Sequence, residues 1–226
     1  MWAIDHRSTW EPAPISVEAP LLIGRRITTR YERFVKPCID RTAALVLALL
    51  FLPIVIVVAL LTRLSVGQPI ILRQTRVGRD GETFTLRKFR TMYPDRRVGS
   101  GDFVGEDRRH THKHANDPRL TRIGKILRAW SLDELPQLFD VLNGKLSVVG
   151  PRPELPQIVS RYEPWQHARH AVKPGLTGLW QIKARGNGEM HEHTEFDIAY
   201  AQRVTFSSDL KIMLLTIPAV LSHRGY

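Results

Sequence analysis

The sequence has few of the features that mark secreted or repetitive proteins. It contains one cysteine, Cys38, so no intramolecular disulfide can form and the chain suits a reducing compartment. The stretch "MWAIDHRSTWEPAPISVEAP" lacks the basic and then apolar layout of a signal peptide, and we expect residues 1–33 to form a flexible arm. There is no internal repeat and no long low-complexity tract. The 226 residues suffice for one domain with appendages and a sizeable core.

Acidic residues are in the minority. The sequence has 22 Asp and Glu against 33 Lys and Arg, which gives a formal net charge of +11 and a pI near 10.3. Such a balance indicates polyanionic partners, which include nucleic acids, anionic membranes and phosphorylated small molecules.

One apolar run, "AALVLALLFLPIVIVVALL", extends from Ala43 to Leu61 without a charge. Its length matches the roughly 20 residues that cross a hydrocarbon core, and a buried core helix is the alternative. Both flanks of the run are basic, although positive charge prefers the cytoplasmic side of a membrane. Pro53 interrupts the run, so we expect residues 34–66 to form a re-entrant helix-break-helix, with a kinked spanning helix as the alternative. The basic flanking residues are Arg25, Arg26, Arg30, Arg33, Lys36 and Arg41 before the run, and Arg63, Arg73, Arg76 and Arg79 after it.

The remaining residues, 67–226, are expected to form a small cytosolic domain of the α+β class, mostly helical. In "PIILRQTRVGRDGETFTLRKFRTM", two extended segments flank Asp80-Gly81, which predicts a β-hairpin. Lys88 and Arg90 make the end of this hairpin strongly basic. These side chains either bind phosphate or form an ordinary solvent-exposed face. The apolar part of "FSSDLKIMLLTIPAVLSH" is too short to span a membrane, and it predicts an interfacial amphipathic helix or ordinary core packing.

An acidic pair, Asp133-Glu134, stands in the stretch "AWSLDELPQLFDVL". Ser131 and Glu134 have the spacing of a capping box, which taken alone favours a structural role for the pair. The following apolar residues recur at helical spacing. Downstream, "LSVVG" predicts a short buried strand, and the prolines of "PRP" hold Arg152 on a stiff backbone suited to phosphate oxygens.

A Gly-, Asp-, Arg- and His-rich stretch, "YPDRRVGSGDFVGEDRRHTHKHANDP", predicts a surface loop. Its alternating histidines suggest a structural metal site as an alternative, together with two histidines further on. These histidines are His110, His112, His114, His191 and His193.

Several motifs in one order resemble those of a known family. "LRKFRTM", "GKILRAWSLDELPQLFDVLNGKLSVVGPRPELP" and "VKPGLTGLWQIKAR" are similar to the bacterial sugar transferases, and more narrowly to the monotopic phosphoglycosyl transferases, or polyprenyl-phosphate hexose-1-phosphate transferases. The resemblance extends from about Phe34 to the C-terminus. Larger members carry several spanning helices ahead of this region, so the resemblance implies a minimal form. The family's usual serine before the membrane proline is replaced here by Leu52.

The resemblance implies transfer of a sugar 1-phosphate from a nucleoside diphosphate sugar, with uridine as the suggested base, to undecaprenyl phosphate. It implies a location at the cytoplasmic face of the bacterial inner membrane, in contact with lipid, and a role in initiating surface or exopolysaccharide synthesis. It assigns Asp133 as the nucleophile that forms a phosphosugar intermediate, and Glu134 as its neighbour at a Mg2+ ion held by both carboxylates. Arg128 corresponds to the contact with the lipid phosphate, while Arg152 and Arg185 correspond to diphosphate or nucleotide contacts.

Two alternatives remain open at this point. A basic, membrane-tethered module that binds nucleic acid or anionic lipid would explain the charge and the apolar run, but not the acidic pair. A glycosyltransferase that moves the sugar alone would release nucleoside diphosphate. We expect no nucleic-acid partner; the sugar, the glycan pathway and formation of a homo-oligomer are not fixed by the sequence.

Overall fold

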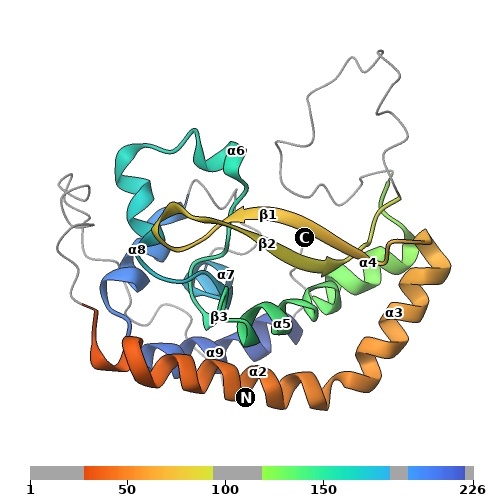
Figure 1. Ribbon diagram of the computed structural model, residues 1–226, viewed down its shortest axis with the longest axis horizontal. Helices are drawn as coiled ribbons and strands as arrows, with labels where there is room; N and C mark the ends of the chain where they lie inside the picture. Colours follow the sequence, from red (N-terminus) through yellow and green to blue (C-terminus); the bar gives the residue numbers. More distant parts are fainter. Residues whose placement is uncertain (1–27, 94–118, 184–192, 222–226) are drawn as a thin grey trace, which may run out of the picture.

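The computed structural model describes residues 28–93, 119–183 and 193–221, which are mostly helical with two small two-stranded sheets (Figure 1). This confirms the predicted mixed, mainly helical class. In chain order the elements are η2 (Tyr31–Val35), α2 (Lys36–Leu50), α3 (Leu52–Val66), β1 (Ile71–Val77), η3 (Arg79–Gly81), β2 (Thr83–Phe89), α4 (Arg122–Ala129), η4 (Leu132–Glu134), α5 (Gln137–Leu142), β3 (Ser147–Val149), α6 (Pro156–Val159), η5 (Pro164–Ala171), β4 (Gly175–Thr177), α7 (Leu179–Lys183), α8 (Thr194–Gln202) and α9 (Phe206–Leu221).

The apolar run is broken in its middle. Helix α2 ends at Leu50 and α3 begins at Leu52, and the two helices are bent by 65° about Phe51. Pro53 lies in the first turn of α3, where its missing N–H and its ring prevent α2 from continuing. Among the described residues, neither helix alone is long and apolar enough to cross a membrane, but the bent pair together meets the length and composition required. The predicted break is therefore confirmed, while re-entry into a membrane stays a prediction.

The predicted hairpin is confirmed. Strands β1 and β2 pair antiparallel, with the register Ile71↔Phe89 at the open end and Val77↔Thr83 near the turn. Asp80 and Gly81 have φ angles of 55° and 79°, in the left-handed region that aspartate and glycine tolerate best. This turn chemistry is the reason that the Asp-Gly signal could be read from the sequence.

The core lies between the hairpin, α5, the second sheet and α9, with α2 along the base (Figure 1). Strand β3, predicted from "LSVVG", is fully buried and pairs in parallel with β4. The main core side chains are Ala44, Leu86, Leu138, Val141, Leu146, Val149 and Ile212. Because Ala44 is buried in this cluster, the beginning of the apolar run is part of the folded domain.

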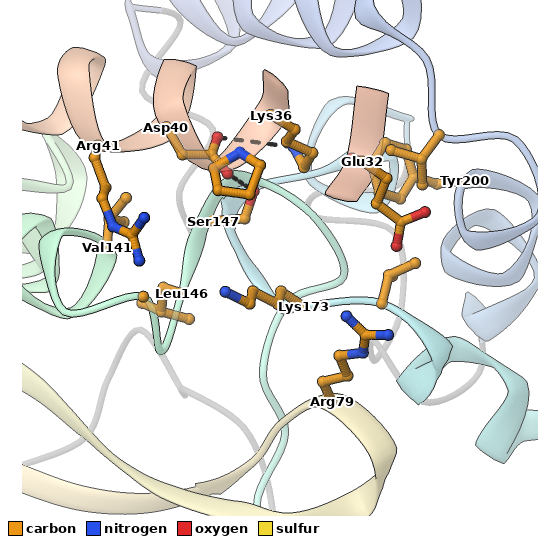
Figure 2. A pocket seen from close by; sticks show the side chains of 14 residues that line it. Glu32, Lys36, Asp40, Arg41, Arg79, Val141, Leu146, Ser147, Lys173 and Tyr200 are labelled. Atoms are coloured by element: carbon orange, nitrogen blue, oxygen red, sulfur yellow. Dashed lines mark hydrogen bonds and ion pairs between the residues drawn. The ribbon is translucent and has the colours of Figure 1, made fainter. Parts of the chain in front are cut away.

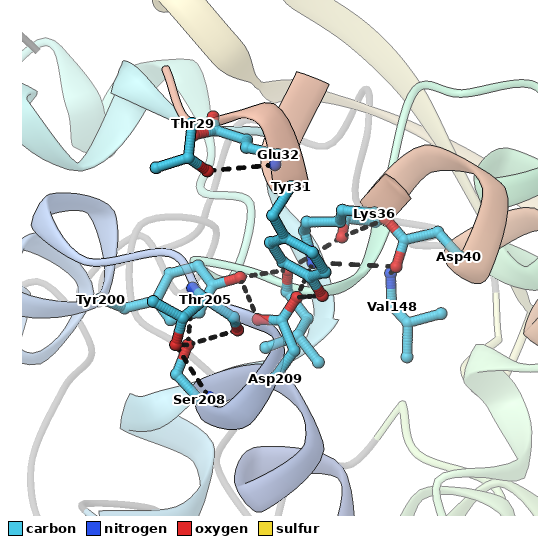
Figure 3. Close-up of polar contacts among 12 residues, drawn as sticks. Thr29, Tyr31, Glu32, Lys36, Asp40, Val148, Tyr200, Thr205, Ser208 and Asp209 are labelled. Atoms are coloured by element: carbon cyan, nitrogen blue, oxygen red, sulfur yellow. Dashed lines mark hydrogen bonds and ion pairs between the residues drawn. The ribbon is translucent and has the colours of Figure 1, made fainter. Parts of the chain in front are cut away.

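The start of α2 lines a cleft on this domain (Figure 2), and a polar network fastens it to α8 and α9 (Figure 3). The Lys36 ammonium donates to Asp209 Oδ2 at 2.6 Å, and the Tyr31 and Tyr200 hydroxyls each donate to the same carboxylate at 2.7 Å. Asp40 accepts from the Ser147 hydroxyl at 2.7 Å. The orientation of the bent helix pair is thus set by buried polar contacts at its N-terminal end.

The capping box predicted before α5 is wrong. Ser131 has a φ of 56° and its side chain does not cap a helix, so the capping box with Glu134 is not formed. A short 3-10 turn, η4, precedes α5, and the Glu134 carboxylate instead accepts a hydrogen bond from Arg152.

The C-terminal helix α9 combines the two readings of its sequence. One face packs on the domain through Asp209 and Ile212, which are buried. The opposite face is apolar and exposed, and it consists of Phe206, Leu210, Leu214 and Ile217. This arrangement satisfies core packing on one side and leaves an apolar strip on the other; its contact with a membrane stays a prediction.

Candidate active site

The acidic pair and the arginine of "PRP" meet in the structure, although they are separate in sequence. Arg152 Nη2 donates to Glu134 Oε1 at 2.5 Å. Asp133, one residue earlier in the η4 turn, is buried. The negative charges of Glu134 and, to a smaller extent, Asp133 raise the pKa of Arg152 above its ordinary value. Three of the residues predicted for the site therefore form one electrostatic cluster.

Arg128 lies at the end of α4, directly before the turn that leads to the acidic pair. Its side chain is buried, and Nε donates to Thr91 Oγ1 at 2.9 Å. Within the described parts of the chain, Arg128 Nη1 is buried without a hydrogen-bond partner. A buried N–H without an acceptor costs free energy, and a phosphate oxygen is the kind of acceptor that a guanidinium binds best. The geometry of Arg128 therefore suits a phosphate ligand.

Three other basic residues are predicted for the site, and the structure describes two of them, Lys88 and Arg90. Strand β2 packs against η4, and Lys88 lies in β2 with Arg90 directly after its end. This arrangement brings the basic end of the hairpin to the acidic turn, while the phosphate-binding roles of Lys88 and Arg90 remain predictions. Arg185 lies outside the described residues, so its predicted role also stays untested.

A buried arginine that sequence reasoning missed supports the "PRP" backbone. Arg169, in η5, is 1% exposed, and its Nη2 donates to the Arg152 carbonyl at 2.7 Å. The same guanidinium is paired with Asp197 of α8 and donates to the Tyr162 hydroxyl at 2.6 Å. Burial raises the pKa of Asp197, and the charge of Arg169 opposes this shift. The three contacts fix the backbone from which the Arg152 side chain extends.

A second ion pair, Arg76–Glu154, holds the two residues that follow Arg152. Arg76 Nη1 donates to the Pro153 carbonyl and to Glu154 Oε1, each at 3.3 Å. The Val77 N–H donates to the Glu154 carbonyl at 2.9 Å, which joins this loop to the hairpin. Burial lowers the pKa of Arg76 to about 10, while Glu154 partly compensates. Arg152 therefore sits on a backbone that is held from both sides.

A third pair positions α5, which follows the acidic turn. Asp140 is fully buried and accepts from the Arg87 backbone N–H at 3.0 Å and from its guanidinium. The Arg87 guanidinium also lies over the Phe139 ring, 5.0 Å from its centroid. Burial raises the pKa of Asp140, and Arg87 counters this shift. This pair connects α5 to strand β2 beside η4.

The two adjacent carboxylates suit a magnesium ion. Mg2+ in phosphate-transferring sites is commonly held by one or two carboxylates together with substrate phosphates, so a complete protein cage is not required. The described residues contain no group of three or more His, Cys, Asp or Glu side chains placed to hold a metal. Asp133 and Glu134 fit the smaller set. The predicted His110, His112, His114 and His191 lie outside the described residues.

The structure thus combines a carboxylate–arginine cluster with a domain joined to a broken apolar helix pair. Comparison with known proteins identifies the family. The family model for bacterial sugar transferases matches residues 31–223, and the chain belongs to that family and is a transferase. This confirms the resemblance found in the sequence.

Named relatives cover most of the chain. The chain is 40% identical over 190 residues to the "Uncharacterized sugar transferase EpsL" of Bacillus subtilis (strain 168), covering 84% of this chain and 89% of that protein. It is 38% identical over 201 residues to the "Exopolysaccharide production protein ExoY" of Rhizobium meliloti (strain 1021), covering 84% and 87%. It is 40% identical over 195 residues to the "UDP-glucose:undecaprenyl-phosphate glucose-1-phosphate transferase" of Caulobacter vibrioides, covering 83% and 70%.

Proposed function

We propose that this chain transfers a sugar 1-phosphate from a UDP-sugar to undecaprenyl phosphate, in the initiation of exopolysaccharide synthesis. The name of the Caulobacter relative supports the donor, the acceptor and the transferred group. The name of a second relative, the "UDP-galactose-lipid carrier transferase" of Erwinia amylovora, 35% identical over 215 residues, supports a UDP-hexose donor. The observation on which the proposal depends most is the Glu134–Arg152 contact beside the buried Asp133.

In the proposed reaction, a carboxylate oxygen of Asp133 attacks the β-phosphorus of the UDP-sugar. The bond between that phosphorus and the bridging oxygen breaks, and UMP leaves with the bonding electrons. A phosphate oxygen of undecaprenyl phosphate then attacks the same phosphorus, which releases the Asp133 carboxylate and forms undecaprenyl diphosphate sugar. Two successive displacements convert one difficult transfer into two easier ones.

The basic residues stabilise the charge that these steps move. Arg152, on its rigid backbone, is suited to the diphosphate, and Arg128, with its buried N–H, is suited to the lipid phosphate. Lys88, Arg90 and Arg185 are proposed to contribute further positive charge. Asp133 and Glu134 would hold a Mg2+ ion, which would supply neutralising charge where negative charge develops.

We also propose that α2 and α3 enter the cytoplasmic face of the bacterial inner membrane and return to it. Each helix has 15 residues and is about 22 Å long at about 1.5 Å per residue, shorter than a hydrocarbon core of about 30 Å. The exposed apolar face of α9, the exposed Ile126 of α4 and the exposed Trp130 directly after α4 would lie at the lipid surface.

The chemical proposal is tested by intact-protein mass spectrometry after quenching with UDP-glucose or UDP-galactose and no lipid acceptor. A covalent adduct of hexose phosphate mass should appear on the wild-type protein and be missing from Asp133→Asn, which keeps nearly the same shape. UMP should be released as the adduct forms, before any lipid is present, and added undecaprenyl phosphate should then remove the adduct and sustain UMP release over many turnovers. Release of UDP would instead indicate transfer of the sugar alone, and an adduct on another residue would overturn the assignment of Asp133. Salt-sensitive DNA binding without any turnover would favour the non-enzymatic alternative.

The topology proposal is tested by labelling in intact cells. Single cysteines at Arg33 and Ser65, in a background without Cys38, should both resist a membrane-impermeant thiol reagent. Pro53→Ala should shift the segment towards spanning, because the proline no longer interrupts the helix. Labelling at only one of the two positions in the otherwise unchanged chain would establish a spanning helix.

A further inference from the structure

A cleft away from the acidic pair gathers cationic side chains from several parts of the chain (Figure 2). Its lining includes Lys36 and Arg41 of α2, Arg79 of the hairpin turn, and Lys173, which precedes β4. The residues proposed for the transfer reaction are not among those that line it. The cleft is therefore a separate feature that the proposed chemistry does not use.

Two of these cations are compensated by carboxylates within the described part of the chain. Lys36 is paired with Asp209 at 2.6 Å and lies 3.7 Å from Asp40. Arg79 Nε lies 3.2 Å from the exposed Asp80 carboxylate. Glu32 also lines the cleft, and it lies at the same end as Arg79 (Figure 2). Of the two acidic residues that line the cleft, Glu32 thus lies at the end of Arg79, and Asp40 lies on the side of Arg41 (Figure 2).

Arg41 and Lys173 are different, because neither forms an ion pair with a described residue. Their charged ends converge over Gly144, whose φ of +73° favours glycine. A Cβ atom at this position would lie 3.0 Å from Arg41 Nη2 and 3.7 Å from Lys173 Nζ. The carboxylate of Asp40 is engaged by the Ser147 hydroxyl and the Val148 N–H. Two like charges therefore share one corner of the cleft, and an anion bound between them would relieve their repulsion.

The electrostatics of Lys173 agree with this geometry. Burial lowers the pKa of Lys173, the charges of Arg41 and Arg79 lower it further, and the Asp40 carboxylate opposes these effects only in part. A bound anion would oppose both effects by favouring the charged ammonium.

The position of the cleft indicates which anion it takes. Arg41 stands two residues before the apolar run, and Leu45 and Leu49 follow it at helical spacing with exposures of 50% and 65%. A ligand with a phosphate in the cleft and hydrocarbon chains along this stripe would match both features. We infer that the cleft binds the phosphate of an anionic phospholipid, an inference that rests on the proposed membrane placement of α2 and α3.

The experiment measures lipid binding to the full chain in detergent by native mass spectrometry. The probes are phosphatidylglycerol, phosphatidylcholine, undecaprenyl phosphate and inorganic phosphate, each titrated separately and in competition. The wild-type protein should retain one phosphatidylglycerol in preference to phosphatidylcholine. Arg41→Gln and Lys173→Gln should each weaken this binding about tenfold, as expected for loss of one charged hydrogen-bond donor.

The matched control is Arg63→Gln, which removes the same charge from an exposed arginine at the other end of the apolar run. It should keep wild-type affinity. Equal weakening by Arg41→Gln and Arg63→Gln would show general charge attraction and overturn the inference. Displacement of phosphatidylglycerol by equimolar inorganic phosphate or undecaprenyl phosphate would also overturn it, in favour of a free-phosphate or carrier-lipid site. Asp133→Asn should bind phosphatidylglycerol normally, so loss of transfer activity and loss of this site are distinguishable.

Discussion

Replacement of Arg169 by methionine should affect both stability and catalysis, because its guanidinium serves three buried partners. The substitution leaves the Asp197 charge buried without its cation, and it removes the donors to the Arg152 carbonyl and the Tyr162 hydroxyl. Removal of one partner of a buried ion pair typically costs about 3–5 kcal/mol. We therefore expect a decrease of this size in the free energy of unfolding, measured by denaturant titration in detergent.

A double variant separates the structural contribution from the positioning of Arg152. Arg169→Met with Asp197→Leu removes both charges, and replacement of a buried pair by apolar residues is often close to neutral in stability. Stability should therefore largely recover, but the Arg152 carbonyl still lacks its donor. A small displacement of a catalytic group can cost about 100-fold in rate, so kcat should remain about 100-fold low with little change in KM if Arg152 binds the diphosphate as proposed. Recovery of both stability and kcat in the double variant would refute a positioning role for Arg169.

Two further predictions follow from buried side chains. Arg128→Gln should raise KM for undecaprenyl phosphate about tenfold and leave KM for the UDP-sugar nearly unchanged. Loss of the hydrogen bond to Thr91 should also lower the free energy of unfolding by about 1 kcal/mol. Steady-state kinetics with each substrate varied in turn measure the two KM values, and an equal rise in both would disprove the prediction. Burial lowers the pKa of His170 to about 3 from its ordinary 6.5. Between these two pH values the unfolded chain binds a proton at His170 that the folded chain does not. The free energy of unfolding therefore falls as the pH decreases through this window. His170→Phe should reduce that loss by up to about 1.4 kcal/mol per pH unit in parallel denaturation series, and identical slopes for both proteins would contradict the assignment.

The features that the sequence predicted correctly depend on neighbouring residues. The break near Pro53, the hairpin at Asp80-Gly81 and the strand at 147–149 follow from local backbone preferences and short apolar patterns. The capping box at Ser131 also looked local, but a tertiary contact decided the outcome. Glu134 is 18 residues from Arg152 in sequence and forms an ion pair with it, so its carboxylate does not cap the turn.

The supporting pairs were not predictable because their spacing has no regular period. Arg169 lies 28 residues from Asp197, and Arg76 lies 78 residues from Glu154. Neither pair belongs to a motif that sets it apart from the many other charged residues of a basic chain. Such partners become identifiable only when burial is known, since a fully buried charge requires a partner whereas an exposed one does not.

The difference in burial between these pairs and the Glu134–Arg152 contact has a chemical consequence. The side chains of Glu134 and Arg152 are 19% and 28% exposed, whereas those of Arg169 and Asp197 are 1% exposed. A charge in contact with solvent can exchange one partner for another at modest desolvation cost, but a fully buried charge cannot. In the proposed reaction Arg152 must turn from Glu134 to a diphosphate, which would free the Glu134 carboxylate for another partner. The half-buried pair is suited to this exchange, and the fully buried Arg169–Asp197 pair keeps the backbone in place while the exchange occurs.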